Sequence, residues 1–172
     1  MEVTVQPAER FHGNTTCPGD KSISHRALMI AAISEGTSVI RGLLEGLDVQ
    51  STAACLRAMG VEIASDPYAT RVTGVGLHSL RAPESVLDAG NSGTTMRLLS
   101  GILAGQSFAT KITGDDSLRS RPMNRVIKPL EQMGAKISAA GDGFAPLEIR
   151  GGVLQPIHYE SSISSAQIKS AV

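Results

Sequence analysis

Two cations and two hydroxyls gather at residues 18–26 (PGDKSISHR), where an extended segment breaks at Pro-Gly and a helix is expected to begin. The first backbone N–H groups of a helix have no intrahelical partner and lie at the positive end of its dipole, so phosphate and carboxylate groups bind there. Lys21 adds a point charge, and Arg26 adds a planar fork of donors that takes two oxygens at once. The stretch indicates an anion site, but taken alone it is equally well explained by a capped helix whose basic side chains face water.

Three further stretches offer the same chemistry. Residues 90–95 (GNSGTT) open a helix where missing side chains let a ligand approach the backbone N–H groups. Arg121 precedes a proline at an expected helix start, and residues 161–165 (SSISS) lead into the amide of Gln167 and the cation of Lys169. A capped turn, a solvated arginine and a polar linker are the simpler explanations, so the case for one site depends on convergence.

Composition limits the partners. Sixteen Lys+Arg balance sixteen Asp+Glu, so no overall field draws the chain to nucleic acid or to a membrane surface. Cys17 and Cys55 have no CxxC spacing and the histidines form no ligand pair, so we expect no metal and reduced cysteines. The chain has neither a signal-peptide pattern nor an apolar run near the ~20 residues of a membrane span, which predicts a soluble, cytoplasmic protein.

Two nucleotide-binding patterns fail. Residues 13–22 resemble a P-loop, but five residues separate the glycines and Asp20 precedes the lysine, where it would repel phosphate. Residues 74–79 (GVGLHS) lack the third glycine of a dinucleotide fingerprint, and no helical pattern follows them.

The elements that must position these residues alternate along the chain and recur. We expect strands at residues 3–7, 10–17, 37–42, 61–63, 69–73, 87–89, 108–113 and 136–138, and helices at 21–34, 48–59, 93–104, 122–134 and from 165 onward. In the first helix the predicted inner stripe is Ile23, Ala27, Ile30, Ala31 and Ser34.

An internal repeat relates the two halves. Residues 56–63 match 130–137 at an offset of 74, and residues 22–26 match 93–97 at an offset of 71. Repeats of this length are supersecondary units that pack on one another, so a pseudo-rotation would bring the helix N-termini to one point. A third unit begins near residue 164, but its helix is too short to be stable alone, so Val172 is expected to be an artificial or processed end, or the unit is completed by another polypeptide.

Four motifs, at residues 18–26, 88–97, 121–123 and 165–170, resemble in order those of the 5-enolpyruvylshikimate-3-phosphate synthase family. The resemblance covers the whole chain but less than half of the family's length. It implies an α/β (α+β) enolpyruvyl transferase fold of repeated βαβαββ units with helix N-termini directed at the active-site cleft. Residues 1–19 would form strands that pack with a second domain, and residues 20–172 would form a substrate domain with two complete units and the start of a third.

The implied reaction moves the enolpyruvyl group of phosphoenolpyruvate to the 5-hydroxyl of shikimate 3-phosphate, without metal or organic cofactor, and releases phosphate. By resemblance shikimate 3-phosphate is bound by Lys21, Ser22, Arg26, Ser165 and Gln167, and phosphoenolpyruvate by Lys21, Gly93, Arg121 and Gln167. Lys21 would also stabilise charge in catalysis, and Gly93 leaves room for phosphoenolpyruvate or the inhibitor glyphosate. Ala166 stands where some relatives have a second serine, which removes one expected hydroxyl contact.

The family's acid/base Asp, Glu and Lys lie outside this chain, so we expect it to be inactive alone and to need the remaining C-terminal portion, in cis or as a separate chain. One alternative is the UDP-N-acetylglucosamine enolpyruvyl transferases, but their Asn after the Lys and their reactive loop Cys are not seen here. The other alternative is a non-catalytic anion-binding or assembly module, and turnover on adding the missing segment in trans would distinguish an enzyme half from such a module.

Overall fold

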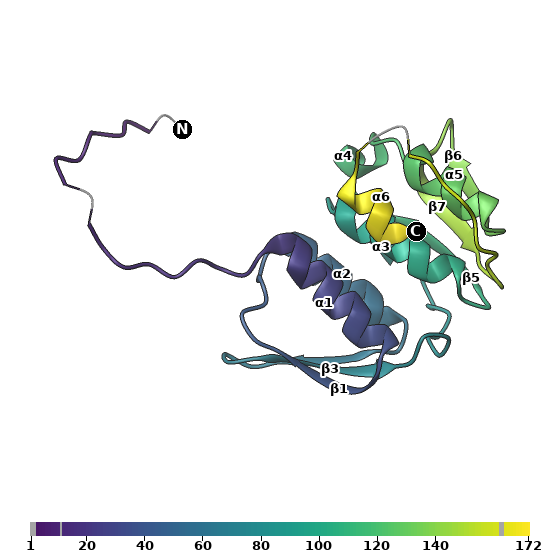
Figure 1. Ribbon diagram of the computed structural model, residues 1–172, viewed down its shortest axis with the longest axis horizontal. Helices are drawn as coiled ribbons and strands as arrows, with labels where there is room; N and C mark the ends of the chain where they lie inside the picture. Colours follow the sequence, from purple (N-terminus) through teal and green to yellow (C-terminus); the bar gives the residue numbers. More distant parts are fainter. Residues whose placement is uncertain (1–2, 11, 162–163) are drawn as a thin grey trace.

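The first unit packs two helices against an antiparallel sheet. The computed structural model describes residues 3–10, 12–161 and 164–172. The first unit contains α1 (Lys21–Ile33), β1 (Glu35–Ile40), α2 (Leu47–Ala58), β2 (Glu62–Ser65) and β3 (Thr70–Val75). The strands pair in the order β1-β3-β2, and the two helices cover one face of the sheet (Figure 1).

The second unit has the same plan with one more strand. It contains β4 (Leu87–Asp88), α3 (Gly93–Ala104), β5 (Ala109–Thr113), the short α4 (Asp116–Arg119), α5 (Asn124–Gln132), β6 (Lys136–Ala140) and β7 (Phe144–Arg150). Its sheet has the order β4-β5-β7-β6, in which β4 and β5 are parallel and the other pairs antiparallel. The order β5-β7-β6 repeats β1-β3-β2, which confirms the predicted repeat.

Equivalent glycines end the second helix of each unit. Gly60 (φ 91°) follows α2 and Gly134 (φ 105°) follows α5, both in the left-handed region that L side chains rarely adopt. The next residue closes the turn in the same way each time: Val61 N donates to Leu56 O at 3.2 Å, and Ala135 N donates to Leu130 O at 3.0 Å. The repeated sequence thus encodes a repeated turn.

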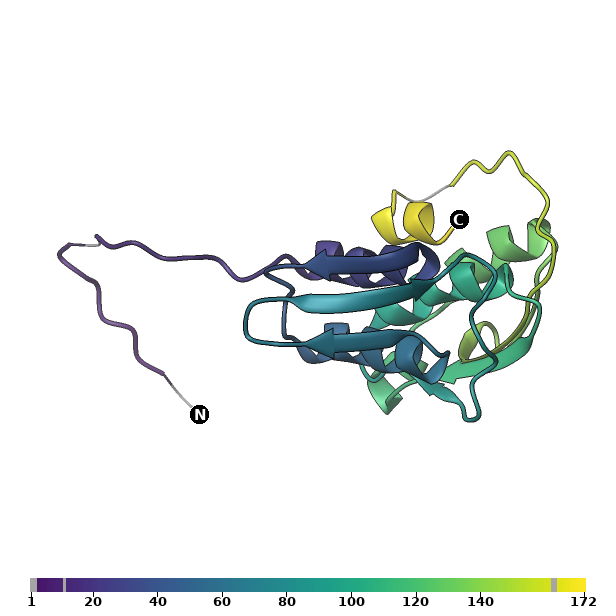
Figure 2. The same cartoon turned by 90° about the horizontal axis from the view of Figure 1, so that it is seen from below.

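A last helix, α6 (Ala166–Ala171), returns to pack on α3. Residues 151–161 carry the chain from β7 without helix or strand, and α6 then lies beside α1 and α3 (Figure 2). Contact is close at Gly101 of α3, where an added Cβ would lie 1.9 Å from the carbonyl oxygen of Ala171. The absent side chain is therefore what allows α6 to approach.

The expected N-terminal strands are not formed. Residues 3–10 and 12–18 run away from the helices as an exposed segment that pairs with no strand (Figure 1), and Val3 and Val5 are 70% and 86% exposed. Alternating apolar residues do not make a strand without a partner for its backbone groups, and no described segment supplies one here.

The predicted inner face of α1 is also wrong. Ile23 and Ile30 are 67% and 60% exposed, whereas Ser24 and His25 are buried. The buried set is Ser24, His25, Leu28, Met29, Ala31 and Ala32. The apolar stripe predicted the wrong buried face because both polar side chains have hydrogen-bond partners. Ser24 Oγ accepts from Leu44 N at 3.0 Å, and His25 is hydrogen-bonded to Thr52.

Three smaller corrections concern element boundaries. The helix expected from Pro122 begins at Asn124, after the separate turn of α4, which is capped by Asp115. The helix expected from residue 48 begins at Leu47, with Gly46 as its N-cap and Asp48 in its first turn. No strand is expected from the sequence at β7, where Pro146 interrupts the alternating pattern, yet β7 lies between β5 and β6 in the sheet.

Candidate functional site

Four helix N-termini are joined by side-chain contacts. Lys21 in the first turn of α1 pairs with Asp48 of α2, and the carbonyl oxygen of Asp48 accepts from Thr95 Oγ1 of α3 at 3.2 Å. Thr94 Oγ1 in turn accepts from Gln167 Nε2 of α6 at 3.0 Å. All these residues lie in first turns, so the structure brings together the predicted N-termini of α1, α3 and α6, with the N-terminus of α2, which was not predicted to take part, between α1 and α3.

Each of three of these helices begins with a capping side chain. Asp20 Oδ1 accepts from Ile23 N at 2.8 Å, Ser92 Oγ from Thr95 N at 3.1 Å, and Ser165 Oγ from Ile168 N at 3.5 Å. A cap uses one of the first four N–H groups, so other amide hydrogens remain for a ligand.

Lys21 is the cation at the start of α1. Its Nζ lies 2.8 Å from Asp48 Oδ2, and its side chain is 53% exposed. A pair this exposed is weak, because solvent screens the charges and holding the long side chain costs entropy. The lysine is therefore free to turn toward an anionic ligand.

Arg26 lies one turn further along α1, and its hydrogen-bond partners within the described part of the chain are neutral. Its Nη2 and Nε donate to the hydroxyl of Ser170 at 2.7 and 3.2 Å, and its Nη1 donates to the carbonyl oxygen of Ser22 at 3.1 Å. The guanidinium thus joins α1 to α6 without charge compensation from any of these groups. A phosphate or carboxylate that replaced the serine hydroxyl would form the stronger, charge-assisted bond.

A second cationic group surrounds Gly93 at the start of α3. An added Cβ there would lie 2.7 Å from Arg97 Nη1 and 3.6 Å from Arg121 Nη1. Arg121 Nη2 donates to Asn91 Oδ1 at 2.7 Å, and Arg97 Nη1 donates to Gln167 Oε1 at 3.0 Å. Because Gly93 has no side chain, a small space remains beside it. The backbone of Gly93, the guanidinium groups of Arg97 and Arg121 and the amide of Gln167 lie around this space.

This group carries excess positive charge. Burial, followed by the neighbouring charges of Arg121 and Arg125, lowers the pKa of Arg97. Asp115 is hydrogen-bonded to this group through the Asn91 amide, which donates to its carboxylate at 2.8 Å and is the main cause of its lowered pKa; the charge of Arg121 lowers that pKa as well. An anion bound at Gly93 would relieve the repulsion among the arginines.

The predicted site residues lie at the starts of α1, α3 and α6 and before α5, and two neighbouring arginines were not among them. Lys21, Ser22 and Arg26 lie on α1, Gly93 on α3, Arg121 between α4 and α5, and Ser165 and Gln167 at the start of α6. The predicted set did not include Arg97 or Arg125. Arg97 had a visible signal, because it stands four residues beyond Gly93 just as Arg26 stands four beyond Ser22; Arg125 had none.

Other kinds of site find less support. Across residues 3–10, 12–161 and 164–172 no group of three His, Cys, Asp or Glu side chains is placed to hold a metal ion. In the same part of the chain no helix has the length and apolar character needed to cross a bilayer.

The chain is similar in sequence to proteins of one family. A family model described as EPSP synthase (3-phosphoshikimate 1-carboxyvinyltransferase) matches residues 5–172. A 3-phosphoshikimate 1-carboxyvinyltransferase from a Synechocystis species is 59% identical over 178 residues, covering 100% of this chain and 40% of the relative. One from Pelobacter propionicus is 52% identical over 171 residues, covering 99% of this chain and 40% of the relative.

A solved structure agrees with the sequence comparison. The EPSP synthase of Acinetobacter baumannii superimposes with a TM-score of 0.89 at 49% identity, covering 92% of this chain and 36% of that one. The chain thus has the α/β enolpyruvyl transferase fold that its motifs indicated, and it spans about 40% of the length of the curated relatives it matches. From residue 5 to residue 172, this chain belongs to the EPSP synthase family.

Proposed function

We propose that this chain is the substrate-binding N-terminal part of a transferase that moves the enolpyruvyl group of phosphoenolpyruvate to the 5-hydroxyl of shikimate 3-phosphate and releases phosphate. The supporting observation is the joining of four helix N-termini, with Lys21, Arg26, Arg97 and Arg121 around them and one paired carboxylate, Asp48. Both substrates carry a phosphate and a carboxylate, which suit such a site.

The two cationic groups suggest a division of roles. We propose that shikimate 3-phosphate is held by Lys21, Ser22, Arg26, Ser165 and Gln167, and phosphoenolpyruvate by Lys21, Gly93, Arg121 and Gln167. Lys21 is the shared cation and is proposed to stabilise charge during the transfer. Gln167 supports the shared use of α6, because its amide bonds to both Arg97 and Thr94.

The remainder of the enzyme is the proposed partner. The site holds cations and hydroxyls but no pair of carboxylates placed for proton transfer among its described residues, so the chain should bind and not turn over. Residues 1–19 are proposed to join the second domain, since residues 3–10 and 12–19 lack ladder partners here, and the substrate domain is proposed to span residues 20–172. A cytoplasmic location stays a prediction.

The test is reconstitution with the separately produced remainder of a related enzyme. We expect no phosphate release from the 172-residue chain with both substrates and release above background from the mixture. Binding by the mixture without turnover would instead favour a non-catalytic module, and turnover by the chain alone would refute the division of labour proposed here.

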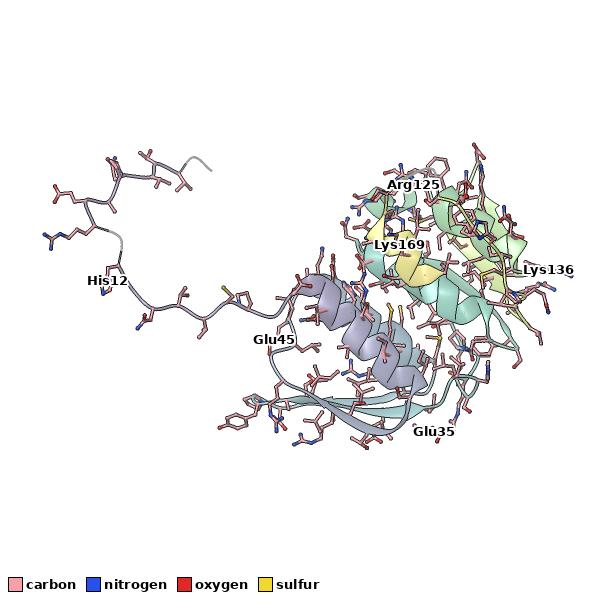
Figure 3. The ribbon with its side chains drawn as sticks, in the orientation of Figure 1. His12, Glu35, Glu45, Arg125, Lys136 and Lys169 are labelled. Carbon is pink, nitrogen blue, oxygen red and sulfur yellow. The ribbon has the colours of Figure 1, made fainter. Side chains whose placement is uncertain are left out.

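Substitutions then separate the roles of the cations. Lys21→Ala should weaken binding of both substrates, and Arg26→Ala mainly that of shikimate 3-phosphate, each by about tenfold to a hundredfold, because hydrogen bonds to charged groups contribute roughly 1.5–3 kcal/mol. Lys136→Ala is the matched control, since Lys136 lies on β6 at the far edge of the molecule from α1 (Figure 3). Titration calorimetry gives the dissociation constants, and unchanged affinity in both variants would make these cations a solvated helix face.

A further inference from the structure

Three buried side chains from three helices form a continuous chain of hydrogen bonds. His25 of α1, Thr52 of α2 and Thr95 of α3 are each 0% exposed. His25 Nδ1 lies 2.7 Å from Thr52 Oγ1, which lies 2.7 Å from Thr95 Oγ1. Thr95 Oγ1 is 2.7 Å from Ser92 Oγ and 3.2 Å from the carbonyl oxygen of Asp48.

The number of hydrogens gives this chain a direction. Each hydroxyl has one proton to donate, and the Asp48 carbonyl can only accept. If Thr95 donates toward Asp48 or Ser92, then Thr52 must donate to Thr95, and His25 must donate to Thr52 through Nδ1–H. In this arrangement every hydroxyl proton of the two threonines has an acceptor.

The opposite direction satisfies fewer groups. It would make His25 Nδ1 the acceptor and put the ring proton on Nε2, which is buried and has no hydrogen-bond partner. It would also remove the bond from Thr95 to the Asp48 carbonyl. An orphaned buried N–H is rarer than an under-used acceptor, so the first direction is favoured.

The ring is held neutral by its surroundings. Burial lowers the pKa of His25, the carboxylate of Asp48 partly opposes this, and the charges of Lys21 and Arg26 lower it further. A neutral ring has one N–H, so its tautomer decides whether the chain runs toward α3 or away from it.

The chain connects the two sides of the proposed site. His25 lies one turn after Lys21 and directly before Arg26, while Ser92 is the N-cap that precedes Gly93. We propose that neutral His25, with its proton on Nδ1, is a positioning residue that sets the spacing between the N-termini of α1 and α3, and so the affinity for the anionic substrates, without contacting them. This inference rests on the proposed function.

The first experiment determines the tautomer of His25 in the 172-residue protein without a partner or substrate. Two-bond ¹H–¹⁵N correlation spectra of histidine-labelled protein at pH 7 should show one ring protonated at Nδ1, and this signal should be missing from His25→Asn. The exposed His12, His78 and His158 serve as references. A His25 ring protonated at Nε2 would overturn the proposal, whatever the protein's function.

The second experiment measures shikimate 3-phosphate affinity in the reconstituted complex. His25→Asn keeps an N–H donor near the position of Nδ1 and should bind within about twofold of the wild type. His25→Leu and Thr52→Val each remove one member of the hydrogen-bonded series and should each weaken shikimate 3-phosphate binding about three- to tenfold. Thr52→Val keeps the side-chain shape, so it remains informative if His25→Leu does not fold.

The possible outcomes distinguish failure of the positioning role from failure of the proposed function. Weaker binding by both broken variants with rescue by Asn supports a positioning role. Lower thermal stability with unchanged affinity would make the chain of hydrogen bonds purely structural and overturn the proposal. If the wild-type complex binds neither substrate, the proposed function fails, and the positioning role fails with it even where the tautomer is as expected.

Discussion

Gly101→Ala should detach α6 and leave the rest of the fold in place. The added Cβ would lie 1.9 Å from the oxygen of Ala171, whereas ordinary contact begins at 3.4 Å, so α6 must move by about 1.5 Å. A shift of that size breaks the bonds of Gln167 to Arg97 and Thr94, which are both 3.0 Å long.

The magnitude follows from two opposing effects. In an ordinary helix interior Gly→Ala stabilises by about 1 kcal/mol. Undocking α6 exposes Ile168, which is 5% exposed now, at a cost of about 1.5–3 kcal/mol. The net loss is about 1 kcal/mol, or roughly 2–4 °C in Tm for a chain of this size. A free six-residue helix is not stable, so α6 should also lose its amide protection.

Hydrogen exchange resolved by peptide, together with a thermal melt, tests this directly. Protection should be lost from residues 166–171 and kept in α1, α2 and the two sheets. Gly105→Ala at the end of the same helix is the control, because its Cβ would lie 3.6 Å from its nearest contact. If Gly101→Ala melts higher than the wild type and α6 keeps its protection, then α6 is not seated on α3 as described.

Four further predictions concern individual residues. Burial lowers the pKa of His25 below its ordinary 6.5, so the contribution of this side chain to folding stability is fully present above pH 6.5 and is lost as the pH falls below that value. Thermal melts should show the stability decreasing by up to about 1.4 kcal/mol per pH unit, with a flatter profile for His25→Asn. The pKa values of Asp66 and Asp115 are also lowered, so these two carboxylates lose their contribution to folding stability only below pH 3.8. Gly93→Ala should leave Tm within about 1 °C, because the one atom its Cβ would crowd is the movable tip of Arg97 at 2.7 Å, while Arg121 stays at an ordinary contact distance of 3.6 Å. The same change should weaken phosphoenolpyruvate binding in the reconstituted complex, and a large fall in Tm would refute this. Iodoacetamide at pH 8 should add one group, at exposed Cys17, since burial raises the pKa of Cys55 to about 12, and two adducts by mass under native conditions would contradict it.

The sequence predicts the repeat well because turn chemistry is local. A turn that needs a left-handed residue requires glycine each time it recurs, so Gly60 and Gly134 can be recognised in the sequence as equivalent positions. The convergence of helix N-termini followed from the same repeat. Motifs 18–26, 88–97 and 165–170 were therefore placed correctly relative to their helices.

What the sequence did not predict depends on partners. The inner face of α1 was misjudged because Ser24 and His25 are buried by hydrogen bonds to α2 and to the loop before it, which no periodicity reports. The role of Arg97 depends on Arg121 and Gln167, which lie 24 and 70 residues away along the chain. The N-terminal strands failed for the same reason, since pairing is a property of two segments.

The open edge of β1 has a consequence for handling the protein. In the second unit the corresponding strand β5 pairs with β4 at Ile112 and Thr113, but among the described residues nothing pairs with the outer edge of β1. Unpaired N–H and C=O groups along a strand are a template for another chain, and β1 carries a single charge, Glu35, to discourage that. At high concentration the isolated chain is thus open to edge-to-edge association through β1, which dilution would limit.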